Sequence, residues 1–202
     1  MLEIGVSVWL APGLNIHRNP LCGRNFEYYS EDPIISGKMA GAVTHGVQNC
    51  GGVGVSVKHF CCNNQEDNRV GVSANVSQRA LREVYLRAFR IAVTEGKPWT
   101  VMSSYNRVNG HYVCNSFDLC TRVLRQEWGF QGLVMSDWNA TEQCSYSEAI
   151  HAGNDLIMPG TVSVSKALEK SLKAGELDRD ALNLSAGRVL ELIFKSETCQ
   201  SF

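Results

Sequence analysis

The 202-residue sequence lacks any marked excess of one charge. Nineteen Lys and Arg residues are balanced by twenty Asp and Glu residues, which leaves a formal net charge of -1. A chain balanced in this way has no sequence-wide field to draw it to nucleic acid or to an anionic membrane. We therefore expect neither nucleic acid nor a membrane surface as a partner.

Long apolar runs are also lacking. No stretch approaches the roughly 18 apolar residues of a membrane span, and Met1-Leu2-Glu3 does not open a basic segment followed by an apolar run. We expect a soluble, cytoplasmic protein, although a longer parent chain could carry a signal and be secreted.

Paired cysteine motifs are missing. The eight cysteines show no C-x-x-C spacing, so we expect reduced, buried thiols, with no disulfide framework. The group formed by His59 with the adjacent Cys61 and Cys62 could suggest zinc. Adjacent cysteines on an extended chain point apart, however, and no second ligand pair follows at suitable spacing. We expect neither a metal nor a cofactor. The cysteines are Cys22, Cys50, Cys61, Cys62, Cys114, Cys120, Cys144 and Cys199.

Short apolar runs alternate with patterns of helical period along the chain. The runs predict strands at 6–11, 53–58, 99–104, 132–136 and 155–158. The intervening patterns predict helices at 34–49, from about 77, at 116–128, 148–152, 164–174 and 178–194. Strand and helix alternating in this way predict a parallel sheet with right-handed crossovers.

Five strands are too few for a closed (β/α)8 barrel. Such a barrel has eight strands and typically about 250 residues, more than this chain has. We therefore expect an α/β protein with a partial or incomplete TIM-type barrel of about five βα units. No internal repeat, low-complexity segment or linker divides the sequence. Residues 1–202 are expected to form a single domain.

Polar side chains follow the carboxyl end of each predicted strand, which in a barrel is the active face. Together they offer three cations, hydrogen-bonding groups, one carboxylate and an aromatic surface. That composition suits a sugar, whose hydroxyls need paired donors and acceptors and whose apolar ring face packs on an aromatic. The residues are Asn15, His17, Arg24, Lys58, His59, Arg69, Tyr105, Asn106, Asp137 and Trp138.

The stretch Gly132 to Trp138 places a carboxylate at the end of a buried strand. Asp137 could be catalytic, or it could simply cap the following turn. Because Arg and Lys residues are expected around it, its ionised form should be favoured, as a nucleophile requires.

Five segments carry a family resemblance in order along the chain. They are Ala11 to Arg18, Gly23 to Pro33, Lys58-His59-Phe60 with Asn63 to Glu66, Ser104 to Gly110, and Gly132 to Trp138. Together they resemble glycoside hydrolase family 3, in its β-glucosidase branch. Cys61-Cys62-Asn63-Asn64 follows Phe60 where the N-acetylglucosaminidases of that family have Pro-Gly-His. The segment therefore resembles the glucosidase and xylosidase branch more closely.

The resemblance implies an enzyme that hydrolyses β-glucosides or related β-glycosides with retention, through a covalent glycosyl-enzyme. Asp137 matches the nucleophile of the family. The resemblance also assigns substrate-binding residues: Arg24, Lys58, His59 and Arg69 around the sugar hydroxyls, Met102 and Tyr105 lining the pocket, and Trp138 packing against the sugar or its leaving group.

The acid/base carboxyl group has no counterpart in this sequence. In the glucosidase branch it comes from a second α/β domain, and none of Glu27, Glu66 or Glu142 matches it; Glu66 is expected to support Arg69 or Lys58. We therefore expect a truncated homologue or fragment that also lacks the first barrel strands. Three alternatives stay open: a non-catalytic sugar-binding module, an inactive fragment, and one part of a split enzyme. In the last, a partner chain or a second copy would complete the barrel.

Overall fold

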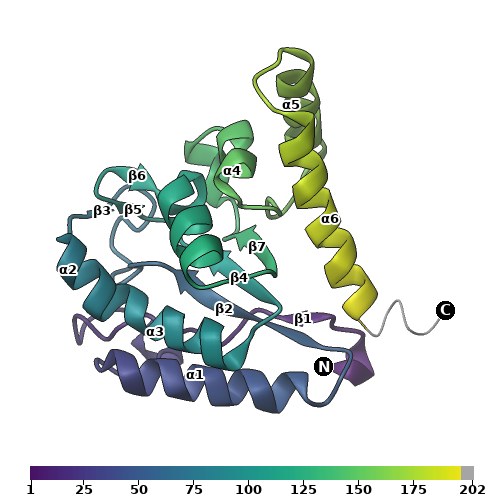
Figure 1. The fold of residues 1–202 in the computed structure, drawn as a ribbon. Coiled ribbons are helices and arrows are strands. Elements are labelled where there is room, and N and C mark those ends of the chain that lie inside the picture. The colour runs from purple at the N-terminus through teal and green to yellow at the C-terminus, as the bar shows by residue number, and fades with distance from the viewer. Residues whose placement is uncertain (197–202) are drawn as a thin grey trace.

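The computed structural model describes residues 1–196 of the chain. Its main elements alternate between helix and strand, as the sequence predicts (Figure 1). In order they are η1 (Leu2–Ile4), β1 (Val8–Trp9), η2 (Asn25–Glu27), α1 (Pro33–Gln48), β2 (Gly54–Phe60), β3 (Ser73–Ala74), α2 (Gln78–Ala80), η3 (Leu81–Tyr85), α3 (Leu86–Ile91), η4 (Ala92–Gly96), β4 (Thr100–Ser103), β5 (Arg107–Val108), β6 (His111–Tyr112), η5 (Val113–Asn115), η6 (Asp118–Glu127), β7 (Leu133–Ser136), η7 (Ala140–Gln143), α4 (Tyr146–Ala152), α5 (Val162–Lys173) and α6 (Arg179–Lys195).

The central sheet has the order β1-β2-β4-β7, and each neighbouring pair is parallel. It is open, with β1 and β7 at its edges, so the described residues form no closed barrel. The predicted incomplete barrel of the α/β class is confirmed. A second, three-stranded sheet of two-residue strands, β3, β5 and β6, was not predicted. It joins the loops that follow β2 and β4 at their carboxyl ends.

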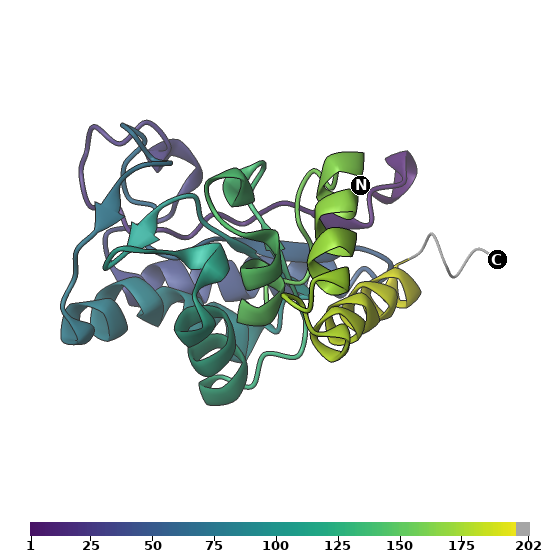
Figure 2. The same ribbon diagram turned by 90° about the horizontal axis from the view of Figure 1, so that it is seen from above.

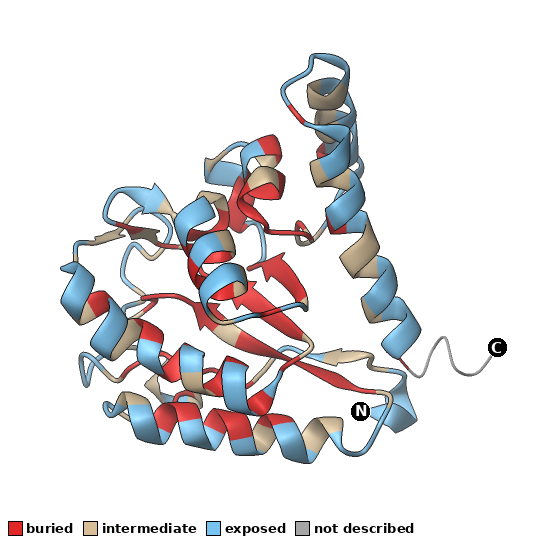
Figure 3. Ribbon diagram, in the orientation of Figure 1, coloured by how far each residue is buried: buried red, intermediate tan, exposed pale blue. Residues whose placement is uncertain are grey.

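One face of the central sheet carries the main core. Alternate strand residues, among them Val55, Val57, Val101 and Val134, are buried there against helices between the strands. Helix α1 packs against β2 and against the helical segment from α3 to η4. Figure 3 shows that β2, β4 and β7 are almost entirely buried, whereas the edge strand β1 is not.

The opposite face is partly covered by α6. Met102, Leu133 and Met135 point to this side and form a cluster that Val189 and Leu192 of α6 join. The carboxylate of Asp155 fixes the arrangement, because it accepts from Arg188 of α6 at 2.7 Å and from the backbone N–H of Val134 in β7 at 2.8 Å. Viewed from above, α5 and α6 lie together at the end of the molecule where the N-terminus lies (Figure 2).

The start of α1 shows how local sequence sets an element. Asp32 is its N-cap, and Oδ1 accepts from the backbone N–H groups of Ile34 at 2.6 Å and Ile35 at 3.3 Å. Pro33 occupies the first helical position, where its missing N–H costs nothing and its fixed φ suits the helix. The sequence Ser30-Glu31-Asp32-Pro33, a polar cap with proline at an early helical position, predicts this start, and the structure confirms it.

Two predictions about the fold are wrong. The stretch predicted as a fifth strand, 155–158, contributes only one bridge, between Leu156 and Met135. The N–H groups of Asp155 and Leu156 both donate to the carbonyl of Val134, so no regular ladder can continue. The helical period of residues 178–194 predicts that Leu182, Val189, Leu190 and Ile193 face inward, but Leu190 and Ile193 are 52% and 46% exposed. None of the helices among residues 1–196 is both long and apolar enough to cross a membrane.

Candidate active site

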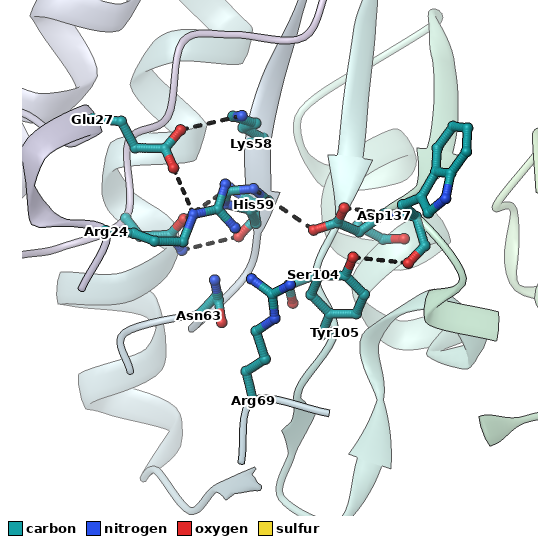
Figure 4. A network of polar contacts seen from close by, with 12 residues as sticks. Arg24, Glu27, Lys58, His59, Asn63, Arg69, Ser104, Tyr105 and Asp137 are labelled. Atoms are coloured by element: carbon teal, nitrogen blue, oxygen red, sulfur yellow. Dashed lines mark hydrogen bonds and ion pairs between the residues drawn. The ribbon is translucent and has the colours of Figure 1, made fainter. Parts of the chain in front are cut away.

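Asp137 lies immediately after β7, at the carboxyl edge of the central sheet (Figure 4). The residue is 8% exposed. Its Oδ1 accepts the backbone N–H of Trp138 at 2.7 Å. Its Oδ2 is buried and accepts no hydrogen bond from any residue of the described part of the chain. One carboxylate oxygen is thus held by the backbone, while the other is left without a donor.

His59, near the end of β2, faces that second oxygen. Its Nε2 is 3.7 Å from Asp137 Oδ2, too far for a hydrogen bond. Its Nδ1 lies 3.2 Å from the Tyr28 hydroxyl, and its backbone N–H donates to Asn15 Oδ1 at 2.8 Å. Burial, together with the charges of Arg24, Lys58 and Arg69, holds the pKa of His59 well below its usual value. The imidazole beside Asp137 is therefore neutral at physiological pH.

The three predicted cations come together around this pair, and each has an acidic partner. Glu27 bridges two of them, with Oε1 2.5 Å from Arg24 Nε and Oε2 3.2 Å from Lys58 Nζ. Glu66 pairs with Arg69 at 2.8 Å, which confirms the expectation that it supports that residue. Asn63 donates to the other Glu66 oxygen at 3.3 Å. These pairs fix the guanidinium and ammonium groups in place.

The ionisation of Asp137 differs from the expectation. Burial raises its pKa above the usual value, although the Trp138 N–H, Arg24, the Tyr105 hydroxyl and Arg69 act in the opposite direction. The expected surplus of positive charge is reduced, because Glu27 pairs with Arg24 and Lys58 and Glu66 pairs with Arg69. The loss of water around Asp137 therefore outweighs the attraction of the cations. The prediction that the cations would dominate is wrong.

Two aromatic side chains border the carboxylate. Tyr105, in the loop after β4, donates its hydroxyl to the Trp138 carbonyl at 2.8 Å, and the Arg69 guanidinium stacks 4.4 Å from its ring centre. Burial and Asp137 raise the pKa of Tyr105 to about 12. The Trp138 residue is 55% exposed. Met102 is 5% exposed and packs with Leu133 and Met135, so its predicted contact with substrate stays a prediction.

Four polar residues hold this arrangement together without having been predicted as site residues: Asn15, Glu27, Tyr28 and Asn63. Asn15 was counted among the polar residues whose composition suits a sugar, but it received no individual role, and Glu27 was considered only as an acid that does not match the acid/base group of the family. All four fall inside the segments that carry the family resemblance. Their positions within those segments are the sequence signal that could have identified them as site residues. No cluster of three or more His, Cys, Asp or Glu side chains suited to a metal occurs within residues 1–196.

An open parallel sheet with a buried carboxylate, paired cations and aromatics at its carboxyl edge defines an α/β protein with the site architecture of barrel enzymes. Comparison with known families is more specific. Residues 1–192 match the model of the glycosyl hydrolase family 3 N terminal domain. The chain belongs to this family, as the resemblance implied.

Curated relatives agree with this assignment. The chain is 44% identical over 190 residues to thermostable beta-glucosidase B of Acetivibrio thermocellus, covering 94% of this chain and 25% of that protein. It is also 44% identical over 196 residues to an exo-alpha-(1->6)-L-arabinopyranosidase of Bifidobacterium breve, covering 97% and 25%. The chain spans about a quarter of the length of these curated relatives.

Solved structures share the fold. Beta-glucosidase 3B from Thermotoga neapolitana in complex with glycerol matches with a TM-score of 0.95 and 49% identity, covering 100% of this chain and 29% of that one. The same enzyme in complex with glucose matches with a TM-score of 0.94 and 49% identity, covering 99% and 29%.

Proposed function

We propose that this chain provides the nucleophile and the sugar-binding groups of a retaining glycoside hydrolase that acts on β-glucosides or related β-glycosides. The observation that carries the proposal is Asp137, whose buried Oδ2 has no hydrogen-bond donor among the described residues and faces a neutral His59. Membership of family 3 and the beta-glucosidase names of relatives support it. The arabinopyranosidase relative leaves the preferred sugar open between glucosides and related glycosides.

In the proposed reaction, Asp137 Oδ2 attacks the anomeric carbon and forms a C–O bond as the glycosidic C–O bond breaks. The leaving oxygen takes a proton from an acid, and a glycosyl-Asp137 ester remains. Water then attacks the same carbon, gives a proton to the same acid/base group, and releases Asp137. The Trp138 N–H on Oδ1 supports this step, because it orients the carboxylate and leaves Oδ2 available.

The surrounding side chains would bind the sugar. Arg24 and Lys58, held by Glu27, and Arg69, held by Glu66, can donate to its hydroxyls from fixed positions. His59 would contact a hydroxyl next to the reacting carbon. Preorganised donors of this kind lose little entropy when the substrate binds. The proposed aromatic and apolar contacts to the sugar are Tyr105, Met102 and Trp138.

The acid/base group is proposed to come from outside the described residues. Retaining hydrolysis needs a second carboxyl group about 5 Å from the nucleophile. Glu27 and Glu66 are poor candidates because each is engaged by cations, and Arg24 and Lys58 hold the pKa of Glu27 below its usual value against the effect of burial. We propose that the acid belongs to a further segment of the same polypeptide or to a partner chain, which includes a second copy.

A fluorinated mechanism-based glycoside tests this function directly, because its activated leaving group needs no acid. Incubation of the chain with such a reagent should leave a glycosyl adduct on Asp137, found by peptide mass spectrometry. Asp137→Asn should show no adduct, whereas Asp118→Asn, at an exposed acid, should label like the wild type. Absence of any adduct under conditions that label a complete family member would refute catalysis by this chain.

A sugar-binding module without catalysis is the second candidate. The pairing of both Glu27 and Glu66 with cations favours it, because neither acid is free to protonate a leaving group. Calorimetric titration with glucose and cellobiose separates the two functions. Binding without labelling supports the module, whereas labelling of Asp137 supports the enzyme.

We also propose that residues 1–202 fold as one domain, of which 197–202 lie outside the described residues. The links from Asp155 to Arg125 at 2.5 Å and to Arg188 at 2.7 Å support this, since they tie α6 to the body of the sheet. Limited proteolysis should then find no stable fragment that has lost α6.

A further inference from the structure

Two thiols that are distant in sequence meet next to the loops of the site. Cys114 Sγ and Cys144 Sγ are 3.3 Å apart. Cys114 lies in η5, which follows β6, and Cys144 follows η7 in the loop after β7. Cys114 is buried and Cys144 is partly exposed. The pair thus has one sulfur that a reagent in solution can approach and one that it cannot.

Neighbouring groups hold the two sulfurs in this position. The Cys144 thiol donates to Asn115 Oδ1 at 3.0 Å, and Asn115 Nδ2 donates to Glu148 Oε2 at 2.9 Å. The Cys114 Sγ atom lies 3.9 Å from the Ala140 carbonyl oxygen. A disulfide requires the sulfurs to come only about 1.3 Å closer than they are.

We propose that Cys114 and Cys144 form a redox-active dithiol that closes to a disulfide on reaction with a low-molecular-weight disulfide. The Cys144 thiolate attacks one sulfur of the reagent, which gives a mixed disulfide and releases one small thiol. Cys114 then loses its proton to solvent base and attacks Cys144 Sγ, which releases the second small thiol. The two protein thiols are oxidised and the reagent is reduced by two electrons.

The acidities of the two thiols agree with this order. The hydrogen bond from Cys114 lowers the pKa of the Cys144 thiol, although burial and Glu148 act in the opposite direction. The hydrogen bond to Cys144 and burial raise the pKa of the Cys114 thiol. The partly exposed thiol is therefore the one that ionises first and attacks, and the buried thiol resolves the mixed disulfide.

The other described cysteines are less suited to this chemistry. Cys61 and Cys62 are adjacent but both buried, so a reagent cannot reach them readily. Cys120 is buried as well, and its thiol donates to the Val113 carbonyl at 3.1 Å. Cys50 is exposed, and the only contact of its thiol within residues 1–196 is to the Gly46 carbonyl at 3.6 Å.

The bond would fasten two loops that already touch. The hydroxyl of Tyr105, in the loop before β5, donates to the carbonyl of Trp138, which precedes η7. A Cys114–Cys144 disulfide would join the same two connections covalently, the one that leads from β4 to η6 and the one that leads from β7 to α4. It closes a chain segment of about 30 residues, so it restricts the unfolded chain and should stabilise the fold.

The experiment uses the full chain, reduced, freed of reductant and incubated with oxidised glutathione near pH 8. After acid quenching and alkylation, peptide mapping should find a Cys114–Cys144 cross-link and two fewer alkylated thiols. The thermal midpoint should rise by about 5 °C and fall again when reductant is added. Cys114→Ser should stop at a glutathione adduct on Cys144 and show no such rise.

Matched controls separate this pair from random oxidation. Cys50→Ser and Cys120→Ser should both keep the cross-link. A wild-type protein that carries glutathione on Cys144 without any cross-link would overturn the proposal, and so would a cross-link of Cys144 to Cys120. The peptide map of the wild-type protein alone distinguishes the Cys114–Cys144 cross-link from these other products. The test therefore remains decisive even if a variant fails to fold. Neither readout depends on glycosidase activity.

Discussion

The imidazole Nε2 of His59 lies 3.7 Å from Asp137 Oδ2, and each residue is shifted away from its charged form by its surroundings. Burial is the largest cause of the pKa shift of both residues. The neutral imidazole therefore makes no ion pair with the carboxylate, and the close pair is not a source of charge stabilisation. As a result, Asp137 Oδ2 stays available for reaction with a substrate, and the buried His59 resists protonation.

The buried histidine should make the fold sensitive to acid. His59 takes up a proton below pH 6.5 in the unfolded chain but not in the folded one, so the unfolded state binds more protons. The free energy of unfolding should then fall as the pH drops below 6.5, by up to about 1.4 kcal/mol per pH unit from this group. Urea denaturation of the wild type and of His59→Gln at pH 7, 6 and 5 measures this fall in the free energy of unfolding. The variant should show the shallower fall.

The control is His111→Gln, at an exposed histidine, which should keep the wild-type slope. Equal slopes for the wild type and His59→Gln would show that His59 is protonated in the folded protein. The pKa assignment at the site would then be wrong.

The labelling of Asp137 should depend on pH through its own ionisation. The nucleophile must be ionised, and burial raises its pKa above 3.8, so the labelling rate should reach half of its maximum at a pH above that value. Tyr105→Phe removes a group that lowers the pKa of Asp137, and it should move this midpoint to higher pH. Initial rates of adduct formation between pH 4 and 7, measured by mass spectrometry, test both statements. A midpoint that moves down in Tyr105→Phe would contradict this account.

Glu27→Gln should weaken sugar binding and stability together. The carboxylate holds both Arg24 and Lys58, and its loss leaves two partly buried cations without their partner. We expect a loss of about 1–3 kcal/mol in the free energy of unfolding and a several-fold weaker affinity for glucose. The control Glu83→Gln breaks an exposed pair with Arg79 and should cost less than about 0.5 kcal/mol. Similar losses in both variants would refute a special role for Glu27.

Asp155→Asn should be strongly destabilising. The carboxylate is fully buried and accepts from Arg125, Arg188 and the Val134 N–H. Removing its charge leaves two poorly solvated guanidinium groups, with an expected loss of about 3–5 kcal/mol. Asp118→Asn, which breaks an exposed pair with Arg122, is the matched control and should change stability little. Chemical denaturation measures both, and a loss below about 1 kcal/mol in Asp155→Asn would contradict the anchoring role of Asp155.

Several features follow from the sequence because they depend on local or repeating patterns. The apolar runs that become β2, β4 and β7 are each followed by polar residues, and their parallel arrangement follows from the helices between them. Asp32 and Pro33 set the start of α1 without help from the rest of the chain. The ordered motifs indicated the family, and Asp137 at the end of a buried strand marked the site.

Only the tertiary structure decided the electrostatics of that site. The sequence shows three cations after predicted strand ends, and Glu27 and Glu66 lie only three residues from Arg24 and Arg69. The pairing of Glu27 with Lys58 and the approach of Arg24 and Arg69 to Asp137, in contrast, arise only in the folded protein. The pKa of Asp137 depends on how much water is excluded, which no local pattern records. The meeting of Cys114 with Cys144, thirty residues apart, is likewise a product of the fold. Short-range preferences act between neighbours in sequence, whereas burial and charge pairing act between neighbours in space.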